Sequence, residues 1–324
     1  ASGRKLKVCL IEKNTVGSAT SSWSTKLIHG GLRYLENFEF KLVRESLKER
    51  EIINKIASDI VRPLPFIIPY SSNQRSKLLI KLGLFLYDYL AGKSLIPRSS
   101  QIKLNIVSPD ILKEKFKTGA MYYDLQIDDK KLVIDNIKDA KKNGASILEN
   151  RKILDIKRKN NYWILKLDDN SFYKSKILIN ATGPWINEVL QNVIKINPKK
   201  IIRLVKGSHI ITKKLYDEEI AFTIQNDDKR VIFVIPYKNK YSLIGTTETE
   251  VNSPNDLKTE KKDIDYLLKA VNEHFIEQIS HNDILETFSG IRPLIEDYKV
   301  ARKVSRDYLF DLNVENKLAP LLNI

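Results

Sequence analysis

The sequence contains very little cysteine and histidine, which limits the chemistry open to it. Its one cysteine, Cys9, cannot form a disulfide within the chain or build a cysteine-ligated metal cluster. The four histidines are scattered, so we expect no metal site. Cys9 lies in a short apolar run, where we expect a small buried side chain rather than a reactive thiol. The HExxH, P-loop and GxSxG motifs are also absent, which argues against zincin, P-loop and α/β-hydrolase chemistry.

Long apolar runs are missing as well. No uncharged stretch reaches the roughly 18 to 20 residues that a membrane-spanning helix needs. The basic residues near the start precede only the short run 8–11, so the pattern of a signal peptide is not present. We therefore expect a cytoplasmic protein, or one that lies on the inner face of the cytoplasmic membrane.

The charge is strongly positive, with a formal net charge of +15. Nucleic acid, anionic lipid and an anionic substrate could each explain it. The basic residues are spread along the chain, and no zinc-finger spacing or RNP-like motif accompanies them. We therefore expect no nucleic-acid partner, and the lipid and substrate interpretations stay open.

Apolar spacing predicts the main secondary-structure elements. Helices are expected at residues 40–57, 132–143 and 263–274. Pro63, Pro65 and Pro69 predict an extended path at the edge of a sheet. Strands are expected at residues 7–13, 145–148, 163–167, 176–180, 201–212, 230–237 and 241–245, the first of them buried and parallel and the fourth buried.

Residues 78–90 (LLIKLGLFLYDYL) form the most apolar segment. It is too short to span a bilayer. One interpretation is a buried or surface-lying helix, and the other is a helix that docks on a membrane surface.

The order of the elements suggests the fold class. A strand and loop are followed by helices, another strand and then a region of antiparallel strands. This order predicts an α/β protein in which a nucleotide-binding part is interleaved with a second, mixed domain.

Glu12 ends the first expected strand. In dinucleotide-binding folds, a carboxylate at the end of the second strand accepts hydrogen bonds from ribose hydroxyls. Strands often end in a charged residue, so Glu12 alone does not decide between a ribose-binding carboxylate and an ordinary charged strand end.

Residues 18–33 (SATSSWSTKLIHGGLR) combine hydroxyl groups, adjacent glycines, a histidine and an arginine. Many short donors and close backbone approach suit contacts with phosphate and a flat cofactor ring. We call this segment the hydroxyl-rich loop. An ordinary surface loop is the alternative.

A second glycine motif, residues 181–185 (ATGPW), follows the strand expected at 176–180. Gly183 would let the backbone pass close to a cofactor, and the indole N–H of Trp185 requires an acceptor. A plain turn at a strand end is the competing interpretation.

Three arginines and one histidine are candidate binding residues. Arg33, Arg292 and Arg306 lie beside glycine, proline or aromatic residues, and the planar guanidinium group binds phosphate through two hydrogen bonds. His209 lies in an apolar strand, where it either faces a cavity or is a satisfied core residue.

Longer blocks of sequence resemble a known family. They are residues 21–50, 61–70, 82–97, 179–185, 203–210, 226–237, 244–248, 289–294 and 305–308. These blocks are distributed along essentially the whole chain, and they resemble the aerobic, membrane-associated, FAD-dependent glycerol-3-phosphate dehydrogenases.

The resemblance implies a role for each matching residue. Arg33, Tyr34 and Arg306 would bind the substrate and its phosphate. His209 or Arg292 would assist loss of the C2 hydroxyl proton, and the choice between them stays open. The residues that would contact FAD are Glu12, Ser21, Ser22, Lys26, Leu27, His29, Gly30, Ala181, Thr182, Gly183 and Trp185.

The implied reaction is hydride transfer from C2 of sn-glycerol 3-phosphate to flavin N5. The product would be dihydroxyacetone phosphate, and electrons would pass to a membrane quinone. Peripheral membrane association is part of the implication, and a homodimer is compatible with it.

The implied architecture is that of the glucose-oxidase and D-amino-acid-oxidase type of flavoprotein. A Rossmann-like FAD-binding domain (residues 1–40 and 125–185) would be interleaved with a mixed antiparallel-sheet substrate domain (residues 41–124 and 186–300). Residues 301–324 would return to the FAD domain.

Two parts of the family pattern are not found in the sequence. These are the glycine loop before the first strand and a lysine-bearing, glycine-rich segment after residue 324, with a helical domain beyond it. We therefore also expect, as an alternative, a truncated remnant that binds FAD weakly or not at all. A further alternative is an anion- or lipid-binding module that retains only the basic surface.

Overall fold

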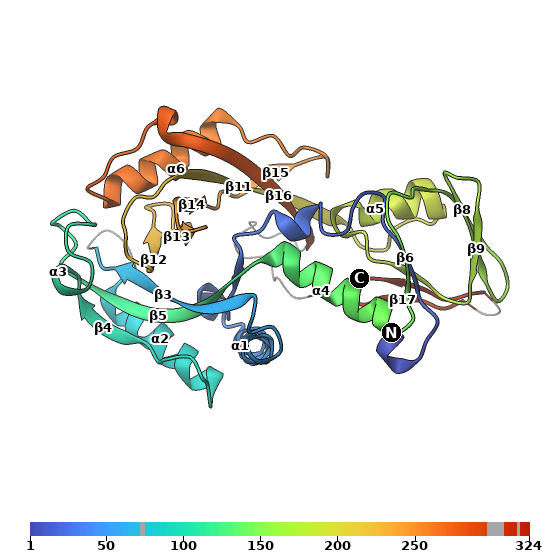
Figure 1. Cartoon of the computed structure of the whole chain (residues 1–324), viewed down its shortest axis with the longest axis horizontal. Coiled ribbons are helices and arrows are strands. Elements are labelled where there is room, and N and C mark those ends of the chain that lie inside the picture. The colour runs from blue at the N-terminus through green and yellow to red at the C-terminus, as the bar shows by residue number, and fades with distance from the viewer. Residues whose placement is uncertain (72–74, 297–307, 316–317) are drawn as a thin grey trace.

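The computed structural model describes residues 1–71, 75–296, 308–315 and 318–324. It is elongated, with one large sheet and its helices in one part and three small sheets in the other (Figure 1). Both termini lie in the part with the small sheets. Arg306, a predicted substrate residue, falls outside the described ranges.

The large sheet has ten strands. Its main path runs β15-β11-β14-β13-β12-β3-β5-β2, with β16 paired to β11 and β4 paired to β5. The strands are β2 (Leu27–Ile28), β3 (Val61–Pro69), β4 (Ser100–Lys103), β5 (Thr118–Ile127), β11 (Ile202–Lys213), β12 (Ala221–Gln225), β13 (Val231–Tyr237), β14 (Tyr241–Gly245), β15 (Thr249–Val251) and β16 (Ile284–Ile295).

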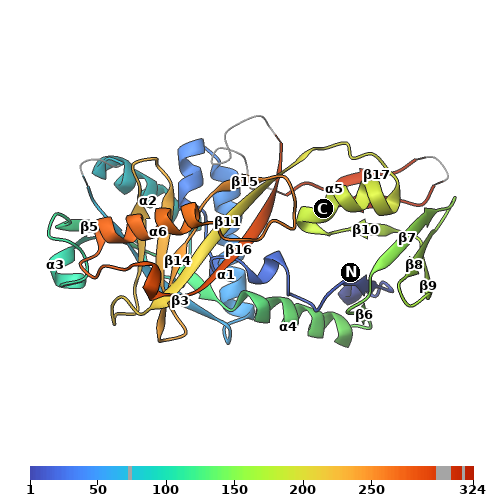
Figure 2. The same cartoon turned by 90° about the horizontal axis from the view of Figure 1, so that it is seen from above.

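Helices cover both faces of this sheet (Figure 1). α1 (Phe40–Ile56) and α2 (Lys77–Ala91) pack on one face, and α6 (Lys261–His274) packs on the other, where α3 (Leu104–Val107) also contributes to the core. The view from above shows α6 crossing the strands (Figure 2). Both faces are therefore removed from water, which explains the nearly continuous apolar runs in β12, β13 and β14.

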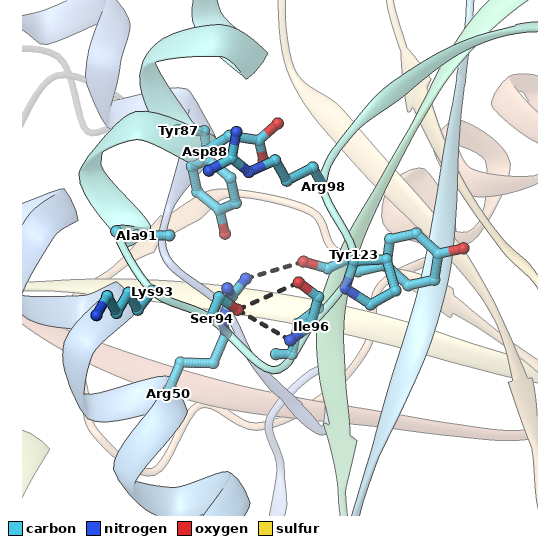
Figure 3. A pocket seen from close by; sticks show the side chains of 11 residues that line it. Arg50, Tyr87, Asp88, Ala91, Lys93, Ser94, Ile96, Arg98 and Tyr123 are labelled. Carbon is cyan, nitrogen blue, oxygen red and sulfur yellow. Dashed lines mark hydrogen bonds between the residues drawn. The ribbon is translucent and has the colours of Figure 1, made fainter.

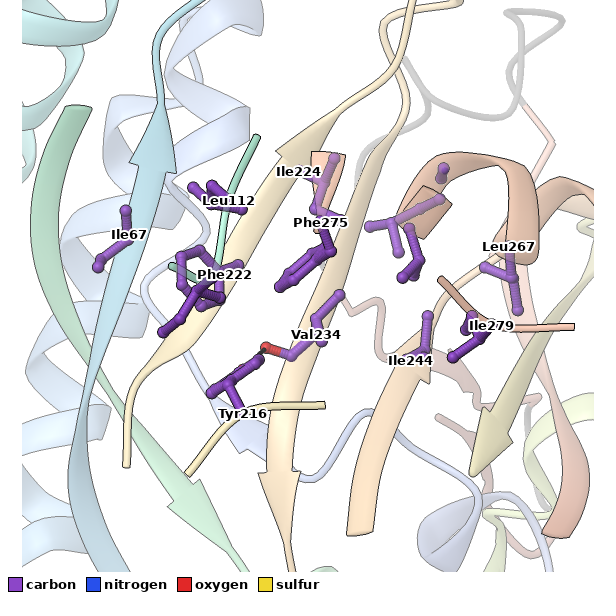
Figure 4. Close-up of a cluster of buried hydrophobic side chains, with 14 of the residues drawn as sticks. Ile67, Leu112, Tyr216, Phe222, Ile224, Val234, Ile244, Leu267, Phe275 and Ile279 are labelled. Carbon is purple, nitrogen blue, oxygen red and sulfur yellow. Dashed lines mark hydrogen bonds between the residues drawn. The ribbon is translucent and has the colours of Figure 1, made fainter. Parts of the chain in front are cut away.

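Alternation along the strands divides the core between the two faces. Val234 and Ile244 contribute to the cluster beneath α6, together with Leu267 of that helix (Figure 4). Their neighbours Ile235 and Leu243 contribute to the cluster beneath α1 and α2. This is the period of two expected for a strand with an apolar layer on each side.

The second part contains the smaller sheets. The pair β1 (Cys9–Ile11) and β6 (Ser146–Leu148) is parallel, and β10 (Leu178–Asn180) is parallel to β18 (Leu321–Asn323), which also pairs with β17 (Asp311–Asn313). An antiparallel sheet consists of β7 (Ile153–Arg158), β8 (Trp163–Leu167) and β9 (Phe172–Ser175). The helical elements not yet given are α4 (Asp129–Lys142), α5 (Ile186–Val189), η1 (Ser2–Arg4), η2 (Thr20–Ser22), η3 (Leu32–Asn37), η4 (Gly183–Trp185), η5 (Leu190–Ile194) and η6 (His281–Asp283).

Most of the expected elements are confirmed, including α1, α4, α6, β8, β11, β13 and β14. The predicted burial of the two parallel strands is wrong. Cys9 and Leu10 are exposed, and so is Ile179 of β10. Among the described residues β1 pairs only with β6, so much of its surface is left uncovered. The expectation of a buried Cys9 is therefore also wrong.

The proline-rich strand differs from the prediction in its position. β3 pairs with β5 along its whole length but with β12 only at Phe66 and Ile67. The edge position therefore holds around Pro63 and Pro65, where a ladder donor is not needed. The predicted edge position is wrong at Phe66 and Ile67, because β3 pairs there with β12 and so joins the two halves of the large sheet.

The apolar segment 78–90 lies within α2. Ile80, Leu84 and Tyr87 are buried against the sheet, whereas Leu82 and Phe85 are more than half exposed. Ser76 caps the helix by accepting a hydrogen bond from the Leu79 backbone. None of the helices in the described ranges has the length and apolar character needed to cross a membrane.

Candidate active site

The hydroxyl-rich loop connects the two parts of the molecule and is fixed by its own polar groups. The Ser22 hydroxyl donates to the Gly17 carbonyl. The Lys26 ammonium donates to the Ser22 carbonyl and to Asp129 at the start of α4, each at 2.9 Å. Leu27 then enters β2 and pairs with Gln126. Of the two predicted cofactor residues, Lys26 therefore also holds the loop to α4, and Ser22 fixes the loop internally.

Gly30 allows the close packing at the end of this loop. A Cβ at Gly30 would lie 2.3 Å from Leu47 Cδ2 and 2.7 Å from the Tyr87 hydroxyl. The Gly30 backbone N–H donates to that hydroxyl at 2.8 Å. His29, just before it, keeps an exposed side chain. The loop thus leaves His29 accessible beside the candidate site, where burial by the surrounding chain, together with the charges of Arg33 and Arg292, lowers its pKa.

A buried charge supports this turn. The Tyr87 hydroxyl and the Arg50 guanidinium both donate to Asp124 Oδ1, at 2.7 and 2.9 Å. Burial raises the pKa of Asp124, and the charge and hydrogen bond of Arg50 act in the opposite direction. Paired and hydrogen-bonded charges of this kind lose much of their stabilisation when one member is removed. Asp124, Arg50 and Tyr87 were not identified from the sequence.

The second glycine motif begins where β10 ends. Ala181 and Thr182 are exposed, and the Thr182 hydroxyl donates to Asn180 Oδ1 at 2.7 Å. Gly183 has φ of 55°. The Trp185 indole N–H donates to Asn255 Oδ1 at 3.1 Å, so the expected need for an acceptor is confirmed.

Glu12 directly follows β1. Its carboxylate accepts from the Asn14 backbone N–H at 2.9 Å, and its side chain is partly exposed. Both Glu12 and Ala181 thus lie just beyond the carboxyl ends of parallel strands. This is the edge at which nucleotides bind in open α/β sheets. No structural feature assigns a role to Ser21, which is exposed in η2.

His209 lies in the centre of β11 and is 1% exposed. Its Nε2 is 3.0 Å from the Thr25 hydroxyl, and its ring stacks on Phe288 at a centroid distance of 4.8 Å. Burial, and then the charges of Arg292 and Lys26, lower the pKa of His209 to about 3. The imidazole is therefore neutral at pH 7.

The two described arginines are held by neighbouring residues. Arg292 Nη2 donates to the Thr246 hydroxyl at 3.2 Å, and Arg33 Nη2 contacts Glu248 Oε1 at 3.1 Å. Tyr34 is partly buried, and its ring packs against the Cα of Gly31, whose φ is 73°. Residues 245–248 were part of the sequence resemblance but were not assigned a role.

These contacts bring most of the predicted residues together. Thr20 of the hydroxyl-rich loop donates to the Ile291 carbonyl at 3.4 Å, and Trp23 packs on Phe288 at 5.4 Å. A cavity of about 440 Å³ then joins Gly183 to Arg292 along the end of β16. The loop, β11, β16 and the second glycine motif thus surround one region.

A second cavity lies elsewhere. It has a volume of about 240 Å³ and is lined by the end of α2 and the following turn (Figure 3). Arg50 and Tyr87 separate it from Gly30. None of the site residues predicted from the sequence lines it. Among the described residues, no cluster of His, Cys, Asp and Glu could hold a metal ion.

Some of the missed residues had a sequence signal. Arg50 lies at helical spacing from Val43 and Leu47, so a charge falls on the apolar face of α1. Asp124 interrupts the apolar residues of β5 in the same way. A buried charge inside an apolar pattern requires a partner, and that requirement could have marked both residues.

Comparison with known proteins gives consistent results. The model of the DAO family, described as FAD dependent oxidoreductase, matches residues 1–311. The chain is 42% identical over its whole length to D-erythritol 1-phosphate dehydrogenase of Brucella abortus, covering 66% of that protein. It is 39% identical to aerobic glycerol-3-phosphate dehydrogenase of Escherichia coli, with all of this chain and 66% of that protein covered. The chain thus spans about two thirds of the length of these curated relatives.

Solved structures share the fold. The glycerol-3-phosphate dehydrogenase of Bacillus halodurans, complexed with FAD, has a TM-score of 0.71 at 24% identity. All of this chain and 56% of that chain are covered. L-α-glycerophosphate oxidase of Mycoplasma pneumoniae, with FAD bound, has a TM-score of 0.73 at 14% identity, with 90% of this chain and 78% of that chain covered. These likenesses confirm the predicted flavoprotein architecture.

Proposed function

The chain belongs to the DAO family of FAD-dependent oxidoreductases, and from this membership we propose that it oxidises sn-glycerol 3-phosphate to dihydroxyacetone phosphate. The observation that carries the proposal is one set of contacts. The hydroxyl-rich loop meets His209 through Thr25, and Arg33 of the same loop meets the segment that holds Arg292. A cationic, partly buried site therefore adjoins the residues expected to hold the cofactor.

The cofactor residues of the proposal are those at the ends of the parallel strands and in the loop. Glu12 would accept hydrogen bonds from the ribose, and the exposed side chain of His29 would lie against the flavin. Ala181, Thr182 and Gly183 border the other side. The open space at the Gly183 Cα supports a close backbone approach there. Bound FAD would supply the hydride acceptor at N5.

Arg33 and Arg292 are the proposed phosphate ligands. Each guanidinium group is positioned by a contact with a neighbouring side chain, and its planar fork of N–H donors matches the geometry of an oxyanion. Tyr34 would add a hydroxyl donor. The predicted third arginine, Arg306, lies outside the described residues and stays a prediction.

His209 is the proposed proton acceptor, acting at Nε2. Its pKa of about 3 is too low for a general base near neutral pH. Arg292 and Lys26 are among the causes of that low value, and both are cationic. A dianionic substrate beside them would offset their charge and raise the pKa of His209. The choice of His209 over Arg292 follows because a guanidinium group does not deprotonate in this pH range.

The electron acceptor we propose is a membrane quinone, reached from the inner face of the cytoplasmic membrane. The exposed side chains of α2 support peripheral docking: Leu78, Leu82, Phe85 and Tyr89 are each more than half exposed. Lys77 and Lys81 lie among them and can reach anionic headgroups.

Vesicle flotation tests the docking surface. Binding to anionic vesicles should fall when Leu82 and Phe85 are both replaced by Ser, while replacement of the exposed Ile276 by Ser, on the far side of the sheet from α2, should not matter. Equal binding of all three proteins would contradict docking through α2. Light scattering decides whether the chain is a monomer or the homodimer left open by the sequence.

A second substrate has its own support. The relative at 42% identity is named for D-erythritol 1-phosphate, which carries a phosphate on a longer polyol. The same two arginines would bind that phosphate, so the contacts described do not separate the two substrates.

Turnover with each substrate decides between them. Anaerobic reduction of the FAD-loaded protein should be faster with sn-glycerol 3-phosphate than with D-erythritol 1-phosphate. The reverse order would assign the second substrate, and reduction by neither would contradict the proposed function.

A further inference from the structure

Residues 245–248 comprise the last residue of β14 and the three residues that connect it to β15, and each of them contacts a different part of the candidate site. Gly245 lies against the His209 ring, since a Cβ there would be 2.1 Å from His209 Cδ2. Thr247 accepts a hydrogen bond at its hydroxyl from the Ser208 backbone N–H at 3.0 Å. The segment is thereby fixed to β11 beside His209.

Thr246 is oriented toward Arg292. Its hydroxyl donates to the Thr247 carbonyl at 3.2 Å, so its lone pairs remain for the Arg292 guanidinium, which donates to it at 3.2 Å. The absence of a side chain at Gly207 makes this contact possible. A Cβ at Gly207 would lie 2.5 Å from both Arg292 Nη2 and Thr246 Oγ1.

Glu248 pairs with the other arginine. The Arg33 and Glu248 side chains are 25% and 11% exposed, and their charged atoms are 3.1 Å apart. Arg33 and Arg292 come from distant parts of the chain. One short segment therefore contacts both of the arginines that the proposed function gives to the phosphate.

We propose that Thr246 and Glu248 are positioning residues for the phosphate-binding arginines, and that the Glu248 carboxylate also weakens phosphate binding by partly neutralising Arg33. The inference rests on the proposed function, in which these arginines bind the substrate phosphate. Glu248 then has two opposing effects, one through the orientation of the guanidinium and one through its charge.

Substitutions at Glu248 separate these effects. Glu248→Gln keeps an oxygen acceptor for Arg33 but removes the charge, so the Kd for glycerol 3-phosphate should fall by about threefold to fivefold. Glu248→Ala removes both the charge and the acceptor, so its Kd for glycerol 3-phosphate should be about tenfold higher than that of Glu248→Gln. Calorimetry on FAD-loaded protein whose flavin has first been reduced with dithionite measures each Kd without turnover, because a reduced flavin cannot accept the hydride. Inorganic phosphate serves as a second probe.

Substitutions at Thr246 test the other contact. Thr246→Val removes the acceptor for Arg292 and should raise KM about tenfold, with a smaller change in kcat. Thr246→Ser keeps the hydroxyl group, so its KM should lie within about twofold of the wild-type value. Glu250→Gln is the matched control. Glu250 lies two positions after Glu248 and pairs with Arg203. Glu250→Gln should therefore leave the Kd for glycerol 3-phosphate unaltered.

The outcomes are distinct. A lower Kd for Glu248→Gln, with a higher Kd for Glu248→Ala than for Glu248→Gln, supports both effects. Equal Kd values for wild type and Glu248→Gln would refute the charge effect, and equal values for the two variants would refute positioning. A wild-type protein that binds no glycerol 3-phosphate would instead contradict the proposed function, and this inference with it.

Discussion

Acid should destabilise this protein through His209. The side chain is 1% exposed, and its surroundings lower its pKa to about 3. In the unfolded chain the same imidazole titrates near its ordinary value of about 6.5. Between these two values the unfolded state binds a proton that the folded state does not. Stability is therefore lost as the pH falls below about 6.5.

The size of the effect follows from the two pKa values. Each pH unit between them corresponds to about 1.4 kcal/mol. From pH 7 to pH 4.5, His209 should thus reduce the free energy of unfolding by about 2.7 kcal/mol. Other groups also titrate in this range, including the buried His274, whose pKa burial lowers too. A comparison with a variant at position 209 removes those contributions.

The assay is urea unfolding, followed by tryptophan fluorescence, at several pH values for wild type and His209→Gln. The glutamine keeps a polar group near Thr25 but does not titrate. The variant's stability should fall less on acidification than that of wild type, by about 2.7 kcal/mol at pH 4.5. His281→Gln, which replaces an exposed histidine, is the control for loss of any histidine. Parallel curves for wild type and His209→Gln would show that His209 is not a source of the loss of stability in acid.

Two further substitutions test the buried support of the hydroxyl-rich loop. Gly30→Ala places a Cβ against neighbouring side chains and should reduce the free energy of unfolding by about 1–3 kcal/mol, with weaker FAD retention, whereas Gly3→Ala, with open space around it, should change neither. No loss in Gly30→Ala, by urea unfolding, would show that the close contact is easily relieved. Asp124→Asn removes one of the two carboxylates that pair with the buried Arg50, the other being Glu51, and should reduce stability by about 3 kcal/mol. A loss below about 1 kcal/mol in the same assay would mean that this ion pair does not support the turn.

Local sequence patterns predicted the elements that can be recognised from a few consecutive residues. The ends of β8 and β14 agree with the prediction, because alternation and the turn between β13 and β14 are visible in a few residues. That turn has positive φ at Lys238 and Asn239, as a tight hairpin requires. The helical spacing of α6 was equally clear.

Burial and long-range contact could not be predicted in the same way. The apolar run of β1 was expected to be buried, but burial depends on which elements pack against it, and Cys9 is exposed. Pro63 suggested an edge, whereas the parallel pairing of β3 with β12 depends on a strand more than a hundred residues away.

The candidate site shows the same division. His209, Arg33 and Arg292 were identified by residue type and by family resemblance. Thr246 and Glu248 were not, because their significance lies in contacts with those residues, which are distant in the sequence. Their assignment required the arrangement of β14 beside β11.

Flavin-dependent oxidation of glycerol 3-phosphate can be followed in the visible absorption spectrum of the protein. The purified protein would be incubated with FAD, desalted, and mixed anaerobically with sn-glycerol 3-phosphate. We predict a retained flavin band near about 450 nm that bleaches on addition of the substrate. A retained band that does not bleach, or no retained band at all, would show that this chain does not oxidise glycerol 3-phosphate with FAD.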